Sequence, residues 1–266
     1  MTIEARIGIV GGNGWLGNAI ASAAVSSGTI DGKNLILSGR SGKRGALEVP
    51  GAVHTRDNAE LAEKSDIIVL SVRPDDFAGL KIDASGKLVI SVMAGIAADD
   101  IAARTGARRI VRSIPNAAAA IRRSFTPWFA TPDVLDSDKR IVQALFDACG
   151  EGAEVPQEAH IDYCVGLTGS GAAFPALLAE AMIAHALSQG LPPDFAARAA
   201  KGVVAGASQL FEDRDSDTSA IVQEMIDYRG TTAAALQTML DNGIKHTVAL
   251  GLEAAAAKAA ALGKPA

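Results

Sequence analysis

The sequence predicts an α/β fold built on a doubly wound sheet in the first half of the chain, and an all-helical second half. Three observations predict this division. An apolar strand runs into a glycine turn and a helix near residue 10, apolar and helical segments then alternate, and only helical patterns follow from about Pro156. At 266 residues the chain has room for two domains, which we place at residues 1–155 and 156–266.

The first strand and helix flank a run of glycines. After the apolar residues 7–10, Gly12, Gly14 and Gly17 follow the G-x-G-x-x-G spacing and lead into a helix over 16–26. In this spacing the first glycine permits a tight turn, the second a close approach of a pyrophosphate, and the third close packing of helix on strand. A tight loop without a ligand is the alternative. The position directly after a buried-type strand favours a Rossmann-type dinucleotide site.

The segments that follow have the lengths expected for the strands of a parallel sheet and for the helices that connect them. We expect strands at residues 34–38, 51–54, 66–72, 88–92 and 109–113. Asp57 and Asn58 are expected to cap a helix that continues through Glu63. Residues 125–130 are expected to form an edge strand, because Pro127 would interrupt a central ladder. Alternation at this spacing predicts right-handed connections between neighbouring strands.

The second half is rich in alanine, with glycine and proline confined to the breaks between helical patterns. We expect helices at residues 157–166, 170–189, 193–212, 216–227, 231–242 and 244–262. Residues 172–186 carry little polar surface around the helix circumference, and such a helix must be buried. An Ala-rich monomeric bundle is one solution. We favour a helical dimerisation domain, and therefore a homodimer or a higher homo-oligomer.

Composition excludes several classes of function. The net charge of −5, the pI near 5.4 and an aromatic content of 4% argue against a nucleic-acid partner. No apolar run approaches the roughly 20 residues of a membrane span. No signal peptide precedes the first strand, so we expect a cytoplasmic protein that acts on a small molecule. Two cysteines and four scattered histidines predict neither a disulfide framework nor a metal site.

The end of the second strand predicts which nicotinamide cofactor binds. In NAD-binding folds a carboxylate at this point holds the ribose 2′-hydroxyl. Here the strand ends Ser38-Gly-Arg40-Ser-Gly-Lys-Arg44, and no acid occurs before Glu48. Cations and hydroxyls suit a 2′-phosphate, so NADPH is favoured, with NADH possible. The alternative interpretation is a solvated basic loop.

Six segments in order along the chain resemble the pyrroline-5-carboxylate reductase family, whose members make proline. They are the glycine turn, residues 57–74, Leu-Val-Ile-Ser-Val-Met-Ala-Gly-Ile at 88–96, Arg-Ser-Ile-Pro-Asn at 112–116, Leu-Thr-Gly-Ser-Gly-Ala-Ala-Phe at 167–174 and Arg-Gly-Thr-Thr at 229–232. The glycine turn, the second strand and this resemblance together assign the cofactor contacts. These are Gly12, Asn13, Gly14, Trp15, Leu16, Gly17, Ser38, Arg40, Asn58, Val72, Arg73, Pro74, Ala94, Gly95, Pro115 and Asn116.

The chain departs from the family pattern in four places. Ala117-Ala118 replace the Thr-Pro that follows Asn116, Ala172 replaces a proline, Arg73 replaces a lysine, and residues 227–229 replace Ser-Pro-Gly. The substrate-facing loop is therefore the least faithful part of the resemblance.

Reduction of a cyclic imine needs a hydride on carbon and a proton on nitrogen, with the two rings held in contact. The resemblance assigns the hydrogen bond to the imine nitrogen to Thr232, with Thr231 and Ser170 beside it. A threonine after Gly230 could equally act as a helix N-cap. Arg229 could bind a carboxylate or be an ordinary exposed arginine, and the role of Glu180 is open.

The resemblance implies an NADPH-dependent oxidoreductase that acts on a C=N bond and converts 1-pyrroline-5-carboxylate to L-proline. Two alternatives remain. The first is a 3-hydroxyacid dehydrogenase-like oxidoreductase, for which Lys201 would be the acid–base group, although no matching motif surrounds it. The second is a non-catalytic paralogue that binds NADPH, which the altered loop at residues 227–229 would fit.

Overall fold

The computed structural model describes residues 1–40, 44–211 and 217–262. By its internal contacts the chain forms two compact units. The first joins Met1–Ser170 with the end of helix α11 (Ile244–Leu262) from Glu253 onward, and the second is Gly171–Leu252. The predicted domain boundary at residue 155 stays a prediction.

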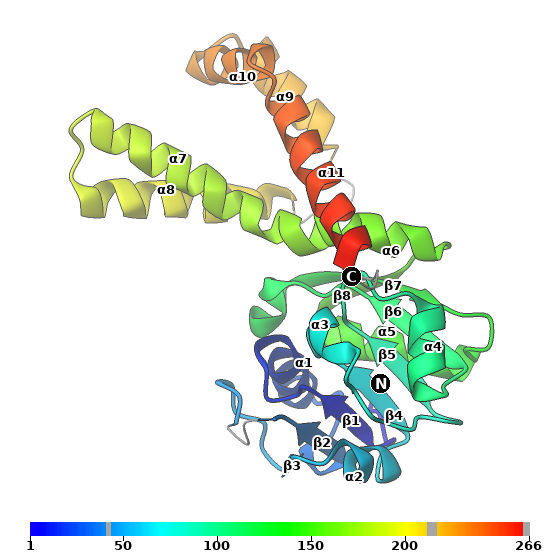
Figure 1. The fold of residues 1–266 in the computed structure, drawn as a ribbon. Coiled ribbons are helices and arrows are strands. Elements are labelled where there is room, and N and C mark those ends of the chain that lie inside the picture. Colours follow the sequence, from blue (N-terminus) through cyan, green and yellow to red (C-terminus); the bar gives the residue numbers. More distant parts are fainter. Residues whose placement is uncertain (41–43, 212–216, 263–266) are drawn as a thin grey trace. The chain divides into compact units, whose positions relative to one another are not determined.

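The first unit is built on one eight-stranded sheet with strand order β3-β2-β1-β4-β5-β6-β7-β8. The strands are β1 (Ile7–Val10), β2 (Leu35–Ser38), β3 (Val53–Thr55), β4 (Ile67–Leu70), β5 (Leu88–Ser91), β6 (Arg109–Ser113), β7 (Ser124–Ala130) and β8 (Gly150–Glu154). The helices are α1 (Trp15–Ser26), α2 (Asn58–Glu63), α3 (Pro74–Phe77), α4 (Ala98–Thr105), α5 (Asp136–Ala148) and α6 (Glu158–Cys164). The chain order reverses between β1 and β4, and this doubly wound topology confirms the expected fold (Figure 1).

Helices cover both faces of this sheet, and each face has its own apolar core. The first core packs Ile20 of α1 and Phe146 of α5 against the strands. The second packs Leu61 of α2 and Ile101 of α4 against the opposite face. Strands β1, β2, β4 and β5 are buried along their whole length, as central parallel strands require. Asp57 caps α2 as predicted, because its side chain accepts hydrogen bonds from the first amides of the helix.

The expectation that residues 125–130 form an edge strand is wrong. β7 lies between β6, to which it is antiparallel, and β8, to which it is parallel. Pro127 accepts a hydrogen bond from the Ile114 amide, so its missing N–H faces the end of β6. Trp128 instead faces β8, and its carbonyl accepts from the Val155 amide. The proline therefore removes one backbone hydrogen bond to the residue that follows β6, and it leaves the hydrogen bonds between β7 and β8 intact.

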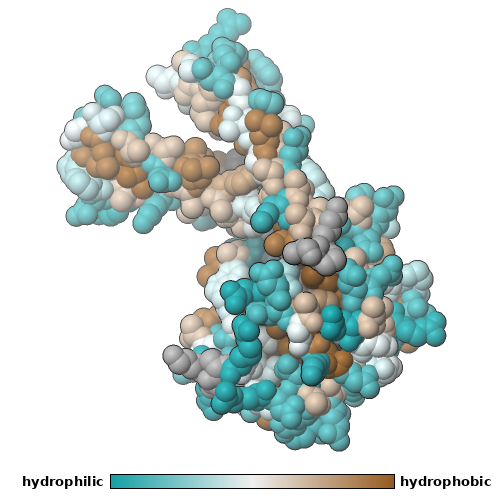
Figure 2. All heavy atoms as spheres, in the orientation of Figure 1, coloured by the Kyte–Doolittle hydropathy of each residue, from teal (hydrophilic) through white to brown (hydrophobic). Residues whose placement is uncertain are grey.

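The second unit consists of helices and their connections. These are α7 (Phe174–Ser188), α8 (Pro193–Ala207), α9 (Thr218–Asp227), α10 (Thr231–Asp241) and the first part of α11. The sequence predicts a helix at each of these places, and the predicted helix ends at residues 212 and 216 lie outside the described residues. The α7–α8 hairpin exposes large apolar side chains, and brown surface lies along it in Figure 2. They are Leu177, Leu178, Met182, Leu187, Leu191, Phe195 and Val203. Such a surface is typical of helices that associate with a second chain.

Among the described residues, one helical run is long and apolar enough to cross a membrane. Residues 158–188 contain an 18-residue window with a mean hydropathy of 1.3. The expectation that no segment approaches a membrane span is therefore wrong by length and composition. An apolar helix that packs against another protein chain meets the same criterion, so the segment is weak evidence for a membrane.

Candidate cofactor and active site

The glycine turn after β1 has the geometry of a phosphate cradle. Gly11 has a φ of +79°, and a side chain there would run into the Ser71 carbonyl. The tight turn that the sequence assigns to Gly12 therefore also requires a glycine at position 11. At Gly17 a Cβ atom would lie 2.8 Å from the Gly11 carbonyl oxygen, so this glycine permits the predicted close packing of α1 on the turn. Helix α1 has no side-chain cap, which leaves its first amides available to an anion.

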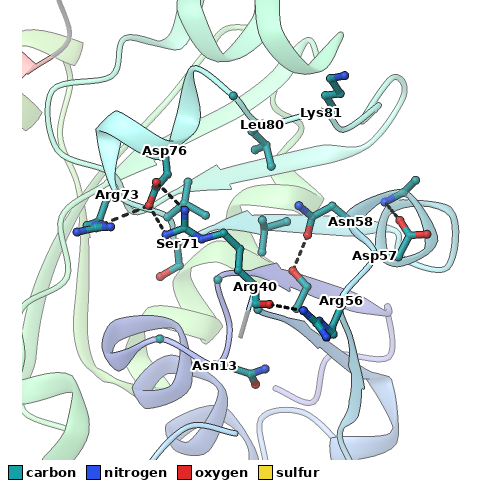
Figure 3. Close-up of a pocket in the computed structure, with 18 of the residues that line it drawn as sticks. Asn13, Arg40, Arg56, Asp57, Asn58, Ser71, Arg73, Asp76, Leu80 and Lys81 are labelled. Atoms are coloured by element: carbon teal, nitrogen blue, oxygen red, sulfur yellow. Dashed lines mark hydrogen bonds and ion pairs between the residues drawn. The ribbon is translucent and has the colours of Figure 1, made fainter. Parts of the chain in front are cut away.

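A cavity of about 990 Å³ opens beside this turn, at the carboxyl ends of β1, β2 and β4. This is the place where doubly wound sheets bind their ligands. Seven of the predicted cofactor contacts line the cavity: Asn13, Gly14, Ser38, Arg40, Asn58, Val72 and Arg73. Figure 3 labels Asn13, Arg40, Asn58 and Arg73 among them. The sequence-predicted contacts from three separate strands therefore come together in one site.

The other predicted contacts near the turn lie outside the cavity wall. Gly12 and Gly17 are buried in the turn, and Leu16 is half-buried. Trp15 begins α1 and is 63% exposed. Pro74 is the first residue of α3, which Arg73 precedes as the N-cap.

A charged cluster closes one side of the cavity. Arg40 donates from Nη1 and Nη2 to the two carboxylate oxygens of Asp76, at 2.9 Å each. Arg73 donates to the same carboxylate at 3.3 Å. Arg56 donates from Nη2 to the Arg40 carbonyl at 3.0 Å. Sequence reasoning missed Asp76 and Arg56, although both follow the carboxyl ends of strands that flank the cavity.

Parts of the predicted basic loop fall outside the described residues. Ser41 and Lys43 lie there, whereas Arg40 and Arg44 are described. Burial lowers the pKa of His54, and the nearby Arg44 charge lowers it further. His54 Nδ1 lies 3.0 Å from Asn13 Oδ1, so the histidine helps to fix the side chain of a cavity-lining residue.

Polar side chains also organise the wall between β2 and α2. The Ser38 hydroxyl donates to Asn58 Oδ1 at 2.7 Å. This bond joins the end of β2 to the first residue of α2 and fixes the orientation of both predicted contacts. The Asn58 amide nitrogen then remains a donor at the cavity wall.

The segments assigned to the nicotinamide lie at the ends of β5 and β6. Ala94 and Gly95 follow β5 and are half-buried. Gly95 has a φ of +76°, and a side chain there would overlap the Ala259 carbonyl. The last turns of α11 therefore pack directly on this loop, which only a glycine allows. None of these residues, nor the buried Pro115, lines the large cavity.

Asn116 serves the protein's own backbone. Its Oδ1 accepts from the Ala118 amide at 2.9 Å, and its Nδ2 donates to the Thr168 carbonyl at 3.0 Å. Thr168 belongs to a π-helical turn, Val165–Ser170, whose last residue is the half-buried Ser170. Turns of this kind are frequent at functional sites. Asn116 therefore connects the end of β6 to the segment that carries a predicted catalytic residue.

Arg112 of β6 connects the sheet to helix α6, the first helix of the helical half, through two ion pairs. Its side chain is 2% exposed and donates to Glu158 and Asp162, both of α6, at 2.7 Å. Its Nε atom is buried without a partner among the described residues. This buried ion-pair network was not assigned from the sequence, which treated Arg112 only as part of a resembling segment.

Thr231 and Thr232 are the first two residues of α10, and Gly230 is the N-cap. Neither hydroxyl caps the helix, and both residues are exposed. The N-cap interpretation of Thr232 is therefore wrong. Arg229 has a φ of +56° where the resembling motif has a glycine, so it adopts the left-handed conformation that favours glycine. Glu180 is exposed on α7.

Comparison with known proteins identifies relatives along the whole chain. The family model for pyrroline-5-carboxylate reductase dimerisation matches residues 158–262, and a model described as NADP oxidoreductase, coenzyme F420-dependent, matches residues 6–95. Pyrroline-5-carboxylate reductase of Vibrio alginolyticus is 32% identical over 214 residues, which cover 77% of this chain and 78% of that protein. The enzyme of the same name from Synechocystis is 28% identical over 265 residues, covering 97% and 98%.

Solved structures give the same result. A pyrroline-5-carboxylate reductase of Coxiella burnetii has a TM-score of 0.86 at 25% identity, covering 99% of this chain and 100% of that one. Pyrroline carboxylate reductase of Plasmodium falciparum, solved with NADP bound, has a TM-score of 0.83 at 23% identity, with the same coverage.

Proposed function

The chain belongs to the pyrroline-5-carboxylate reductase family, and on that premise we propose that it reduces 1-pyrroline-5-carboxylate to L-proline with NADPH. The observation that carries the proposal is the cavity of about 990 Å³ at the switch point of the sheet, bordered by the uncapped start of α1 and by several arginines. It is a site for an anionic dinucleotide, and no acid stands at the end of β2 to select the 2′-hydroxyl of NADH.

The residues of the cavity fit NADPH. A Cβ atom at Gly14 would lie 3.0 Å from the Gly11 carbonyl oxygen, so a side chain there would crowd the cradle where the pyrophosphate approaches the backbone. Asn13, Val72 and Arg73 border the adjoining space, and Arg40 reaches across it. The cofactor supplies a hydride when it is bound.

The substrate half of the site uses hydroxyls and amides. Thr232 hydrogen-bonds the imine nitrogen and orients it, because its exposed hydroxyl makes no cap bond that would compete. The first amides of α10 are free of a side-chain cap and suit the substrate carboxylate. Thr231 and Ser170 are the further substrate contacts in this proposal. A protonated imine is already electrophilic, so these residues position it and need not act as strong acids.

The enzyme works as a homo-oligomer. The match to a dimerisation domain and the exposed apolar faces of α7 and α8 both support association between copies of this chain. We propose a homodimer or a higher homo-oligomer in the cytoplasm, acting on a small molecule without a nucleic-acid or membrane partner. This assembly would cover the apolar run at 158–188.

Cofactor oxidation with candidate substrates tests the proposal. Full-length protein is mixed with NADPH or NADH and 1-pyrroline-5-carboxylate, and in the reverse direction with NADP and a 3-hydroxyacid. We expect oxidation of NADPH by the imine, faster than that of NADH at equal concentration. Turnover of the 3-hydroxyacid instead would indicate the dehydrogenase alternative. Tight NADPH binding without turnover of either compound would indicate a non-catalytic paralogue.

A further inference from the structure

We propose that Arg56 is the principal residue that recognises the 2′-phosphate of NADPH in this protein, while Arg40 is committed to Asp76. The inference rests on the proposed function and adds a specificity-determining residue to it. Neither the glycine turn nor the end of β2 marks Arg56, which follows β3.

The charge of Arg40 is paired with the carboxylate of Asp76. Both of its terminal nitrogens donate to the Asp76 carboxylate at 2.9 Å, in the two-pronged geometry that neutralises a guanidinium most completely. Asp76 comes from α3, on the other side of the cavity, and its side chain is 25% exposed. The Arg40 side chain is 78% exposed, and a phosphate that drew it away would leave Asp76 with the single, longer bond from Arg73 at 3.3 Å.

The charge of Arg56 is differently placed. Arg56 lines the same cavity, and among the described residues no carboxylate pairs with it. Its one hydrogen bond within the described part of the chain goes to a neutral group, the Arg40 carbonyl, which holds the guanidinium beside the cavity without cancelling its charge. The adjacent carboxylate, Asp57, faces the Ala59 and Glu60 amides at the start of α2. Arg56 therefore offers donors and an uncompensated positive charge.

The position of Arg56 suits the 2′-phosphate. The Arg40 carbonyl lies two residues beyond Ser38, at the end of β2, where this fold meets the 2′ position of the ribose. Figure 3 shows Arg56 beside that carbonyl, while the Arg40 side chain extends away toward Asp76. Ser38 and Asn58 lie on the same wall and can add neutral hydrogen bonds. Together these residues offer one free guanidinium with polar support.

Two adenosine nucleotides isolate this interaction. Adenosine 2′,5′-bisphosphate carries the 2′-phosphate and 5′-AMP lacks it, and neither depends on the substrate site. For the parent protein and Arg56→Ala we would measure the Kd of each nucleotide, and of NADPH and NADH, by titration calorimetry. A charge-assisted hydrogen bond predicts that Arg56→Ala weakens the bisphosphate and NADPH about 10-fold or more. The Kd of 5′-AMP and NADH should change less than twofold.

Three variants serve as comparisons. Arg56→Lys keeps the charge and should retain part of the preference for nucleotides that carry the 2′-phosphate. Arg40→Ala should weaken nucleotides with and without the 2′-phosphate by similar factors. Arg104→Ala, at an exposed position of α4 away from the cavity, should change nothing. Melting curves of all variants verify folding.

The outcomes separate this inference from the proposed function. If Arg56→Ala leaves the preference for the bisphosphate intact, or if Arg40→Ala abolishes it, Arg56 is not the recognising residue, and the proposed NADPH-dependent reduction is unaffected. If the parent protein binds 5′-AMP as tightly as the bisphosphate, both the inference and the NADPH assignment fail. Loss of imine reduction with intact bisphosphate preference would overturn the proposed reaction alone.

Discussion

Replacement of Thr232 by alanine is the most direct test of the proposed chemistry. The Thr232 side chain makes no capping bond, because Gly230 is the N-cap of α10. Loss of a threonine cap would cost about 1 kcal/mol, but here that contribution is absent. Alanine also has a higher helix propensity than threonine by about 0.6 kcal/mol. The substitution should therefore leave the unfolding free energy unchanged or slightly higher.

The expected effect on activity is much larger. A hydrogen bond to a charged group contributes about 1.5–3 kcal/mol, and each 1.4 kcal/mol is a factor of ten. If Thr232 holds the protonated imine nitrogen, Thr232→Ala should lower kcat/KM about 10- to 150-fold while the Kd of NADPH stays constant. Thr232→Ser should keep most of the activity, and Thr232→Val, which keeps the shape without the hydroxyl, should lose it.

Melting temperature and initial rate are measured on the same samples. Thr238→Ala provides a control on the same helix, because among the described residues the Thr238 hydroxyl donates only to the Ala234 carbonyl of its own helix. It should not alter kcat/KM. Thr232→Ala with full specific activity, or with an activity loss that only follows unfolding, would refute the assignment of Thr232 to the imine nitrogen.

Three further predictions follow from buried and partly buried groups. Arg112→Met removes two charge-assisted bonds but leaves Glu158 and Asp162 34% and 40% exposed, so it should lower the unfolding free energy by about 1.5–3 kcal/mol, measured in urea. For the same reason a chain ending at residue 155, which lacks both carboxylates, should unfold at a lower urea concentration than one ending at residue 170, which keeps them; both lack the end of α11 that packs on the Gly95 loop. The folded-state pKa of His54 is lowered, so stability should fall as pH drops below 6.5, the unfolded-state value, and His54→Gln should flatten that dependence.

The cofactor half of the site could be predicted because its signals are local in sequence. The spacing of Gly12, Gly14 and Gly17 encodes a turn, and the apolar run of β1 encodes a buried strand, both within a dozen residues. The alternation of such units then limits the topology to a right-handed, doubly wound sheet. Seven predicted contacts accordingly line one cavity.

The missed features depend on residues that meet only after folding. Strand β8 reads Gly-Glu-Gly-Ala-Glu and has no alternation of apolar residues, so no sequence signature places it beside β7. Without β8, the proline at position 127 indicates that β7 is an edge strand. Arg112 lies 46 residues from Glu158, and nothing local marks the pair. In the same way Asp76, which follows β4, pairs with Arg40 at the end of β2. A count of basic residues at the end of β2 therefore could not identify which of the cations lacks a carboxylate partner.

The helical half presents a different limitation. Its helices were predictable because glycine and proline separate them, but the pattern does not show what covers their apolar faces. In the single chain α7 and α10 expose both apolar side chains and the threonines assigned to the substrate. An exposed hydroxyl in water is a poor means of orienting an imine, because water competes for every hydrogen bond. If the substrate hydroxyls act as proposed, they must be shielded from water; association between copies, which the dimerisation domain implies, would supply such a cover, and activity should then require the oligomer.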